Sequence, residues 1–230
     1  MSSQTLMRTL LQAALIVIAS PAVAASLNVS PILLETFAPQ QMATLTLRNN
    51  GSVAIVGQVR VFAWTQVNGL DVLSPTRAIT GSPPMAEIRP GTDYTIRVVR
   101  VDTQPVVGEE AYRLVVDEVP DASARRNGVV AVALRYVIPV FFLAPGAGQG
   151  RLTWSIVRSE GRTALMATNT GDRRIQLRDL ALGGKPVAKG LSGYVLGHSQ
   201  RTWPLASVSA NLAVTAVSDR GPVSGTANGR

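Results

Sequence analysis

The neighbouring side chains of His198 and Ser199 could act as a base and a nucleophile. Adjacent residues in a turn rarely face each other, and the chain lacks the G-x-S-x-G segment that presents a catalytic serine in many hydrolases. We therefore interpret this pair as part of a surface loop. The consecutive carboxylates Glu109 and Glu110 enter a predicted strand and point to opposite faces, which predicts a solvated strand start rather than an acid and base pair.

This chain has few residues of the types that metal binding and thiol chemistry need. It has no cysteine and one histidine, which excludes a disulfide framework, thiol catalysis and cysteine-rich metal sites, and makes a histidine-based zinc site hard to build. Asp102, Asp117 and Asp121 lack the spacing of a calcium loop, and no glycine-rich loop is placed to hold a phosphate. The sequence predicts a protein with no cofactor, no metal and no enzymatic activity.

Composition is that of an ordinary folded protein. Of 230 residues, 46% are hydrophobic and 16% are charged, so one large domain or two of about 100 residues each could form. Lysine and arginine total 22 against 14 acidic residues, a net charge of +8. Because the arginines are scattered and no basic run is longer than a pair, we interpret this charge as a solvated surface and expect no nucleic-acid partner.

The N-terminus has the pattern of a secretory signal peptide over residues 1–25. Arg8 is the only charged residue there, an apolar run covers residues 10–19, and residues 20–24 offer an A-x-A cleavage site. The run is short for a membrane span, and no later segment supplies about 20 unbroken apolar residues. We expect export to the periplasm with no membrane insertion after cleavage. The alternative is an uncleaved N-terminal anchor.

Most of the remaining chain predicts β-strands. Apolar and polar residues alternate over residues 42–48, a β-branched run covers residues 53–64, and the turn residues Asn and Gly lie between them. Such strands without a long helical period predict an antiparallel sandwich. The Gly- and Pro-rich residues 145–150 predict a linker, which divides the chain into domains over residues 26–144 and 151–230, the second one smaller.

The stretch over residues 128–145 is apolar and carries one charge. As a strand, it has one face formed by Val130, Val132, Leu134, Tyr136 and Ile138, and another formed by Val129, Ala131, Ala133, Arg135 and Val137. Both faces are apolar over most of their length, so the second face needs a cover. The sequence allows two alternatives. The second face is packed by this chain itself, or it is covered by a partner that pairs with the strand as an exposed edge.

Several segments together resemble the periplasmic pilus-assembly chaperones of the PapD-like family. The most specific part runs from residues 110–120 through a polar loop and the apolar strand to Ile-Pro-Val-Phe-Phe at residues 138–142. Residues 82–91, 194–197 and 201–203 are also similar, so the resemblance covers essentially the whole chain after the signal peptide. Residues 138–141 and 194–197 look more like the archaic branch, which serves spore-coat-protein-U-like or Csu-type pilins.

The resemblance implies an all-β fold of two immunoglobulin-like sandwich domains set at an angle. It implies a periplasmic chaperone that stabilises pilus subunits by donor-strand complementation and delivers them to an outer-membrane usher. It places the donor side chains on one face of the apolar strand, at Val130, Val132, Leu134, Tyr136 and Ile138. It also likens Glu118 to an acidic residue near the domain junction that fixes the interdomain angle through a salt bridge.

Better-known members of the family hold the C-terminal carboxylate of the subunit with two basic residues. Pro31 and Pro139 align with those positions here, so this sequence departs from the pattern. A guanidinium can bind a carboxylate through two parallel hydrogen bonds, and the candidate anchors are Arg135, Arg97 and Arg100.

Other function classes stay open. One is an exported structural subunit that assembles by strand exchange, and another is a periplasmic hydrolase or carbohydrate-binding enzyme. A self-capping oligomer of the chaperone is a further hypothesis, because an uncovered apolar edge invites edge-to-edge pairing.

Overall fold

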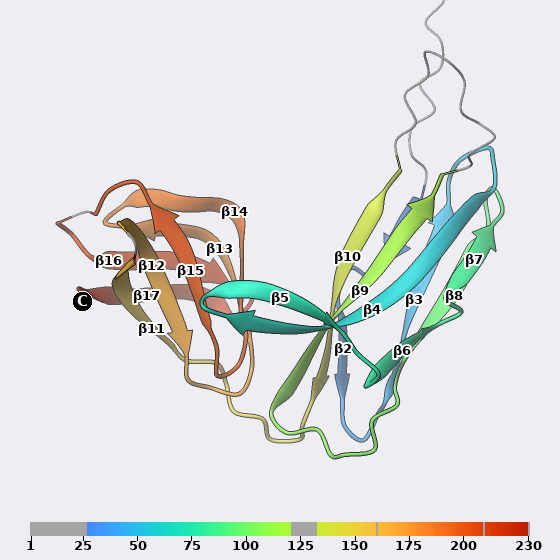
Figure 1. Ribbon diagram of the computed structural model, residues 1–230, viewed down its shortest axis with the longest axis horizontal. Helices are drawn as coiled ribbons and strands as arrows, with labels where there is room; N and C mark the ends of the chain where they lie inside the picture. Colours follow the sequence, from blue (N-terminus) through green and yellow to red (C-terminus); the bar gives the residue numbers. More distant parts are fainter. Residues whose placement is uncertain (1–26, 121–132, 160, 209, 230) are drawn as a thin grey trace, which may run out of the picture.

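The computed structural model describes residues 27–120, 133–159, 161–208 and 210–229, and within these ranges it contains strands and no helix (Figure 1). The predicted signal peptide, the donor residues Val130 and Val132, and Asp121 lie outside the described residues. The strands form two bodies side by side, one from β1 to β10 and one from β11 to β17. The predicted all-β class with two sandwiches is confirmed.

The first sandwich has a four-stranded sheet and a six-stranded sheet. The first sheet has the order β1 (Leu27–Ser30), β3 (Met42–Asn49), β8 (Asp93–Arg100), β6 (Ile79–Ser82). The second has the order β2 (Leu34–Phe37), β10 (Arg135–Leu143), β9 (Glu109–Val119), β4 (Ile55–Val67), β5 (Leu70–Pro75), with β7 (Met85–Ile88) paired to β4.

The N-terminal segment contributes a strand to each sheet. β1 pairs antiparallel with β3, and after a cis peptide bond at Ser30-Pro31 the chain continues as β2, which pairs parallel with β10. This crossing ties the two sheets together at one edge and leaves β2 beside the end of the apolar stretch.

The core of the first sandwich follows from the predicted alternation. In β3, Leu45, Leu47 and Asn49 are buried while the residues between them are partly or fully exposed, as the period of two requires. The facing strands add their own alternate side chains, chiefly Ile88, Ile96, Val98, Leu114, Val116, Val140 and Phe142. The turn predicted at residues 49–52 separates β3 from β4.

The second sandwich is one continuous run of seven strands. Its order is β14 (Lys185–Val195), β13 (Ile175–Leu182), β16 (Ala213–Ser218), β17 (Gly221–Gly229), β11 (Leu152–Ser159), β12 (Arg162–Asn169), β15 (Gln200–Leu205). The two ends of the run meet, since the indole Nε1 of Trp203 on β15 donates to the backbone oxygen of Ser192 on β14 at 2.9 Å. A separate hydrophobic core, which includes Trp154, Leu165 and Leu177, fills the space this closure encloses.

Candidate functional site

Within the described part of the apolar stretch, Arg135–Leu143 form β10, and the two faces of β10 are covered by different parts of the chain. Tyr136 and Ile138 face the core of the first sandwich. Phe141 and Leu143, on the opposite face, belong to a cluster with Trp64 of β4 and with Tyr194 and Leu196 of the second sandwich. At the C-terminal end of β10 the second apolar face is therefore covered by this chain itself. Nearer the start of β10, Val137 on the same face is 47% exposed.

Tyr136 and Ile138 are corrected from the predicted donor set, because both side chains are used inside this chain. Ile138 is 3% exposed within the first core, and Tyr136 packs on the same core while its hydroxyl donates to the backbone oxygen of Leu27. Leu134 is half-buried and precedes β10 without joining that cluster. Of the predicted donors that the structure describes, Leu134 alone lies outside the core.

One side of β10 is open next to this position. β2 pairs with β10 from Val140 onward, and along residues 135–139 no described strand lies on the side away from β9. The backbone oxygen of Leu134 accepts from the Glu118 amide at 2.9 Å. Since opposite residues alternate between bonded and non-bonded pairs, the amides of Arg135 and Val137 point to the open side. We call this side, along residues 135–139, the open edge.

A groove between the two sandwiches begins beside the open edge. We define this interdomain groove by its lining: Ile32, Asp71, Arg113, Val137, Pro139, Gln176, Arg178, Leu191, Ser192, Gly193, Tyr194 and Arg201. Its volume is about 470 Å³, inside the range of about 300–1,000 Å³ that ligand sites have. Ile32 is 75% and Leu191 60% exposed, so uncovered apolar side chains from both sandwiches face this space.

The groove also carries an excess of positive charge. Three of its lining residues are arginines and one is a carboxylate, Asp71, which pairs with Arg201 at 2.6 Å. Arg113 on β9 lies flat over the Trp64 ring, with its Cζ 3.6 Å from the ring centroid. Within the described residues the side chains of Arg113 and Arg178 have no hydrogen bond or ion pair. Burial lowers the pKa of the Arg113 guanidinium, and the charges of Tyr194 and Asp71 oppose this only in part, so a further anion at this position would stabilise the charged guanidinium.

None of the three predicted anchors lines the groove, and the anchor prediction is corrected. Arg100 is buried on β8 and binds both carboxylate oxygens of Glu110, at 2.8 and 2.7 Å. Arg97 lies exposed on the same strand, which belongs to the four-stranded sheet and not to the six-stranded sheet that contains β10. Arg135 is on the face of Val137 but pairs with Asp117. Arg113 was missed because its significance depends on Trp64 of a neighbouring strand, which the sequence does not place.

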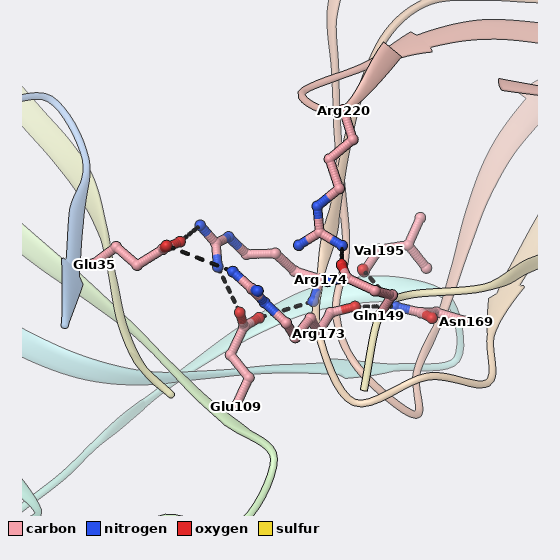
Figure 2. A network of polar contacts seen from close by, with 8 residues as sticks. All are labelled: Glu35, Glu109, Gln149, Asn169, Arg173, Arg174, Val195 and Arg220. Atoms are coloured by element: carbon pink, nitrogen blue, oxygen red, sulfur yellow. Dashed lines mark hydrogen bonds and ion pairs between the residues drawn. The ribbon is translucent and has the colours of Figure 1, made fainter. Parts of the chain in front are cut away.

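The two sandwiches are joined by a buried polar network (Figure 2). The Arg174 guanidinium binds the Glu109 carboxylate at 2.5 Å and also pairs with Glu35, and the Arg174 amide donates to Glu109 at 2.9 Å. The side chains of Arg174 and Glu109 are 4% and 1% exposed. Burial raises the pKa of the Glu109 carboxyl, against the attraction of the Arg174 charge. Arg173 adds a longer pair to Glu35, at 3.5 Å.

This network corrects two predictions about acidic residues. Glu109 and Glu110 do point to opposite sides, but the predicted solvated strand start is wrong, because Glu109 enters the interdomain network and Glu110 binds Arg100. Glu118 is not at the domain junction. It lies at the far end of β9, where its carboxylate accepts from the Leu134 amide at 3.3 Å and β9 pairs with β4.

A hairpin makes the second junction between the sandwiches. β4 and β5 are connected by Asn68 and Gly69, both with positive φ, and Figure 1 shows this hairpin reaching across to the second sandwich. The Gln66 side-chain amide donates to the backbone oxygen of Tyr194 at 2.8 Å and accepts from the backbone amide of Leu196 at 3.0 Å. At the tip, the Thr202 amide donates to the Gly69 oxygen at 3.0 Å. The groove therefore has walls that are fixed relative to each other.

The remaining residues with chemical side chains form no reactive set. His198 contacts the Asp172 carboxylate at 2.8 Å, while the Ser199 hydroxyl donates to the Gly197 oxygen at 3.1 Å, so the pair does not interact as base and nucleophile. The described ranges contain no group of three His, Cys, Asp or Glu residues that could hold a metal ion. In the same ranges there is no helix long and apolar enough to cross a membrane.

Comparisons with known proteins agree with this architecture. An uncharacterized fimbrial chaperone of Escherichia coli K12, YcbF, is 25% identical over 197 residues, which are 81% of this chain and 80% of YcbF. The CsuC chaperone, solved in complex with the tip adhesion subunit CsuE of archaic Csu pili of Acinetobacter baumannii, is 26% identical with a TM-score of 0.76, over 90% of this chain and 100% of CsuC. This match confirms the predicted likeness to the archaic branch.

The Salmonella enterica chaperone SafB, solved with the SafA pilin, shares the fold at 19% identity and a TM-score of 0.64, over 87% of this chain and 96% of that one. The immunoglobulin-like character of the two sandwiches is confirmed by these likenesses. The family described as pili and flagellar-assembly chaperone, PapD N-terminal domain, matches residues 26–147. Because this match takes in more than half of the chain, the chain belongs to that family of pilus-assembly chaperones.

Proposed function

We propose that this chain binds pilus subunits in the periplasm by lending them strand β10, and that it hands them to an outer-membrane usher without catalysing a reaction. The open edge along residues 135–139 supports this proposal, since an unpaired strand edge beside a groove with exposed apolar side chains is what strand addition uses. A subunit strand would pair with the exposed amides of Arg135 and Val137 and cover the apolar side chains there.

The apolar residues that precede β10 supply the donor side chains in this proposal. Leu134 is the described one, and Val130 and Val132 are proposed from the alternation of the sequence alone. Burying a Val or Leu side chain contributes about 1.5 to 3 kcal/mol, before the ordering of the partners is subtracted. Three such side chains give a complex that is firm but can still be exchanged at the usher.

We propose Arg113 as the group that binds the C-terminal carboxylate of the subunit. Its guanidinium lines the groove, lies over Trp64 and makes no direct ion pair within the described residues, although the Asp71 charge acts on it. Val137 and Pro139 lie on the same face of the sheet, and Pro139 is the residue directly opposite Arg113. A subunit strand paired at the open edge would thus bring its end toward Arg113.

The class of subunit is proposed from the relatives. CsuC is a chaperone of archaic Csu pili, and the SafB structure holds a pilin. We propose a spore-coat-protein-U-like pilin as the partner of this chain. An exported structural subunit, the alternative, is not favoured, because the family is one of chaperones.

We propose the same division of the chain as the sequence predicts: a signal peptide over residues 1–25, domains over residues 26–144 and 151–230, and a linker between them. The end of β10 at Leu143 and the start of β11 at Leu152 support the position of the linker. The signal-peptide pattern and the family support the periplasm as the location.

Co-purification from the periplasm tests the proposal. The chain is expressed with each small exported β-sandwich protein encoded beside its gene, as wild type, as Leu134→Arg, and as Val217→Arg, a matched charge on an exposed valine of β16. We expect a one-to-one complex with wild type and Val217→Arg and loss of the complex with folded Leu134→Arg. Equal recovery with Leu134→Arg would reject β10 as the donor strand.

A further inference from the structure

We propose that Arg178 of the second sandwich binds an acidic side chain of the segment that occupies the interdomain groove, so that the chaperone prefers subunits with Asp or Glu close to their C-terminus. This inference rests on the proposed function, because it takes the occupant of the groove to be the C-terminal strand of a partner protein. It adds a second anion contact, supplied by the other domain.

The position of Arg178 in β13 supports this role. The register between β13 and β14 shifts on both sides of Arg178, and irregularities of this kind redirect a side chain. Leu177 before it is fully buried, whereas Arg178 is exposed and lines the groove. The adjacent carboxylate, Asp179, accepts from the Gly190 amide at 2.8 Å. Asp179 is therefore engaged with the backbone of β14.

The only carboxylate among the lining residues of the groove has its own partners. Asp71 accepts from the Trp64 indole at 3.0 Å, from Gln66 at 2.8 Å and from Arg201 at 2.6 Å. Burial alone would raise the pKa of the Asp71 carboxyl, but these hydrogen bonds together with the Arg201 charge lower it, so Asp71 stays ionised and paired. Within the described residues, the direct ion pair of Asp71 is with Arg201, and its charge also acts on Arg113 at longer range, while Arg178 has no ion pair.

Two guanidiniums without a direct ion pair, one from each sandwich, favour an occupant with two anionic groups. A terminal carboxylate supplies one negative charge, which the bidentate geometry of one arginine satisfies. Arg113 comes from β9 of the first sandwich and Arg178 from β13 of the second, so one terminal carboxylate leaves the charge on the other wall without a partner. The apolar Ile32, Val137 and Leu191 line the same groove and can contact the alternate apolar side chains of an extended strand.

The test uses synthetic peptides with alternating apolar residues, a free C-terminus and randomised final positions, together with the same peptides amidated at the C-terminus. They are selected on the wild-type mature chain and on Arg178→Gln, Arg113→Gln and Arg162→Gln. Arg162 is an exposed arginine of the same sandwich that does not line the groove, so its variant controls for net charge. The affinity of the best acidic peptide is then compared with that of its Asn or Gln counterpart.

We expect wild type and Arg162→Gln to favour the acidic peptide by about fivefold, the upper end for an exposed ion pair, and Arg178→Gln to lose that preference. Arg178→Glu should instead favour a lysine at the same position. Arg113→Gln should weaken every peptide and abolish the advantage of a free C-terminus.

A wild-type chain that requires the free C-terminus but shows no acidic preference would overturn the role of Arg178 and leave the proposed function standing. An acidic preference that survives in Arg178→Gln would also overturn it. If wild type binds free and amidated peptides equally, or binds none, the proposed function fails and this inference fails with it.

Discussion

Asn49 and Asn169 hold equivalent turns in the two sandwiches. Each is buried at the end of its strand, β3 or β12, and each side-chain oxygen accepts from the glycine amide two residues later, Gly51 or Gly171. Each side-chain amide donates to the carbonyl four residues later and to a carbonyl of a distant segment: Val53 and Ile88 for Asn49, Arg173 and Val195 for Asn169. The Asn169 oxygen also accepts from the Arg151 amide at 2.9 Å. One side-chain amide thus satisfies at least three backbone groups in each domain.

Replacing either asparagine by alanine should destabilise its sandwich. Asn49→Ala and Asn169→Ala each leave buried backbone groups without partners, which lowers the free energy of unfolding by about 1–3 kcal/mol. Urea unfolding, monitored by amide hydrogen exchange in each domain, measures the change in the free energy of unfolding. Asn50→Ala, at an exposed neighbour, should stay within about 0.5 kcal/mol of wild type. An Asn49→Ala chain as stable as Asn50→Ala would contradict the role of the buried amide.

Removing Arg174 should loosen the domain junction. In Arg174→Met the Glu109 carboxylate remains buried without its partner, and breaking a buried pair in this way lowers the free energy of unfolding by about 3–5 kcal/mol. The double variant Arg174→Met with Glu109→Gln should recover most of that loss, because no buried charge is left at Glu109. Urea denaturation of the three chains measures both effects. A double variant no more stable than Arg174→Met would show that the loss does not come from the buried charge.

The stability of wild type should carry a pH-dependent part that Glu109→Gln lacks. Burial raises the pKa of Glu109 above its ordinary value of 4.5, so the folded chain keeps a proton that the unfolded chain has released. The free energy of unfolding therefore falls as the pH rises from 4.5 to the raised pKa. The free energy of unfolding in urea is measured at several pH values for wild type and for Glu109→Gln, and the difference between the two at each pH isolates the contribution of Glu109. A constant difference across that range would contradict the raised pKa.

The hairpin tip should be sensitive to a single methyl group. A Cβ at Gly69 would lie 2.5 Å from Thr202 Cγ2, so Gly69→Ala should both strain its positive φ and push the hairpin from the second sandwich. Gly91 has a similar φ of +68° with nothing within 4 Å, which makes Gly91→Ala the matched control for strain. Faster exchange of the Thr202 amide is expected in Gly69→Ala alone. Equal exchange in both variants would mean that the tip does not hold the domains together.

Much of the fold could be read from residues 42–64, because a period of two and an Asn-Gly turn are local signals. The double apolar character of residues 128–145 likewise predicted a strand covered on two faces. The sequence could not predict which residues of this strand are covered by the second sandwich and which stay exposed, because Phe141 contacts Tyr194 only after the two sandwiches pack.

The charged residues at the junction were harder still to predict. Glu109 and Arg174 are 65 positions apart and belong to different sandwiches, so neither sequence segment indicates the other. Arg113 looks like an ordinary strand arginine until the fold places it over Trp64. By contrast, the acidic Glu118 matched a family position in sequence while its actual contacts lie at the far end of β9.

Amide hydrogen exchange on the free chain and on the co-purified subunit complex tests the lending of β10 most directly. In the free chain, the amides of Arg135 and Val137 should exchange fast, because they point to the open edge, while those of Tyr136 and Ile138 should be protected by β9. In the complex, we expect Arg135 and Val137 to become as protected as their neighbours. If their exchange is unchanged when the subunit is bound, the subunit does not pair with β10 and the account is wrong.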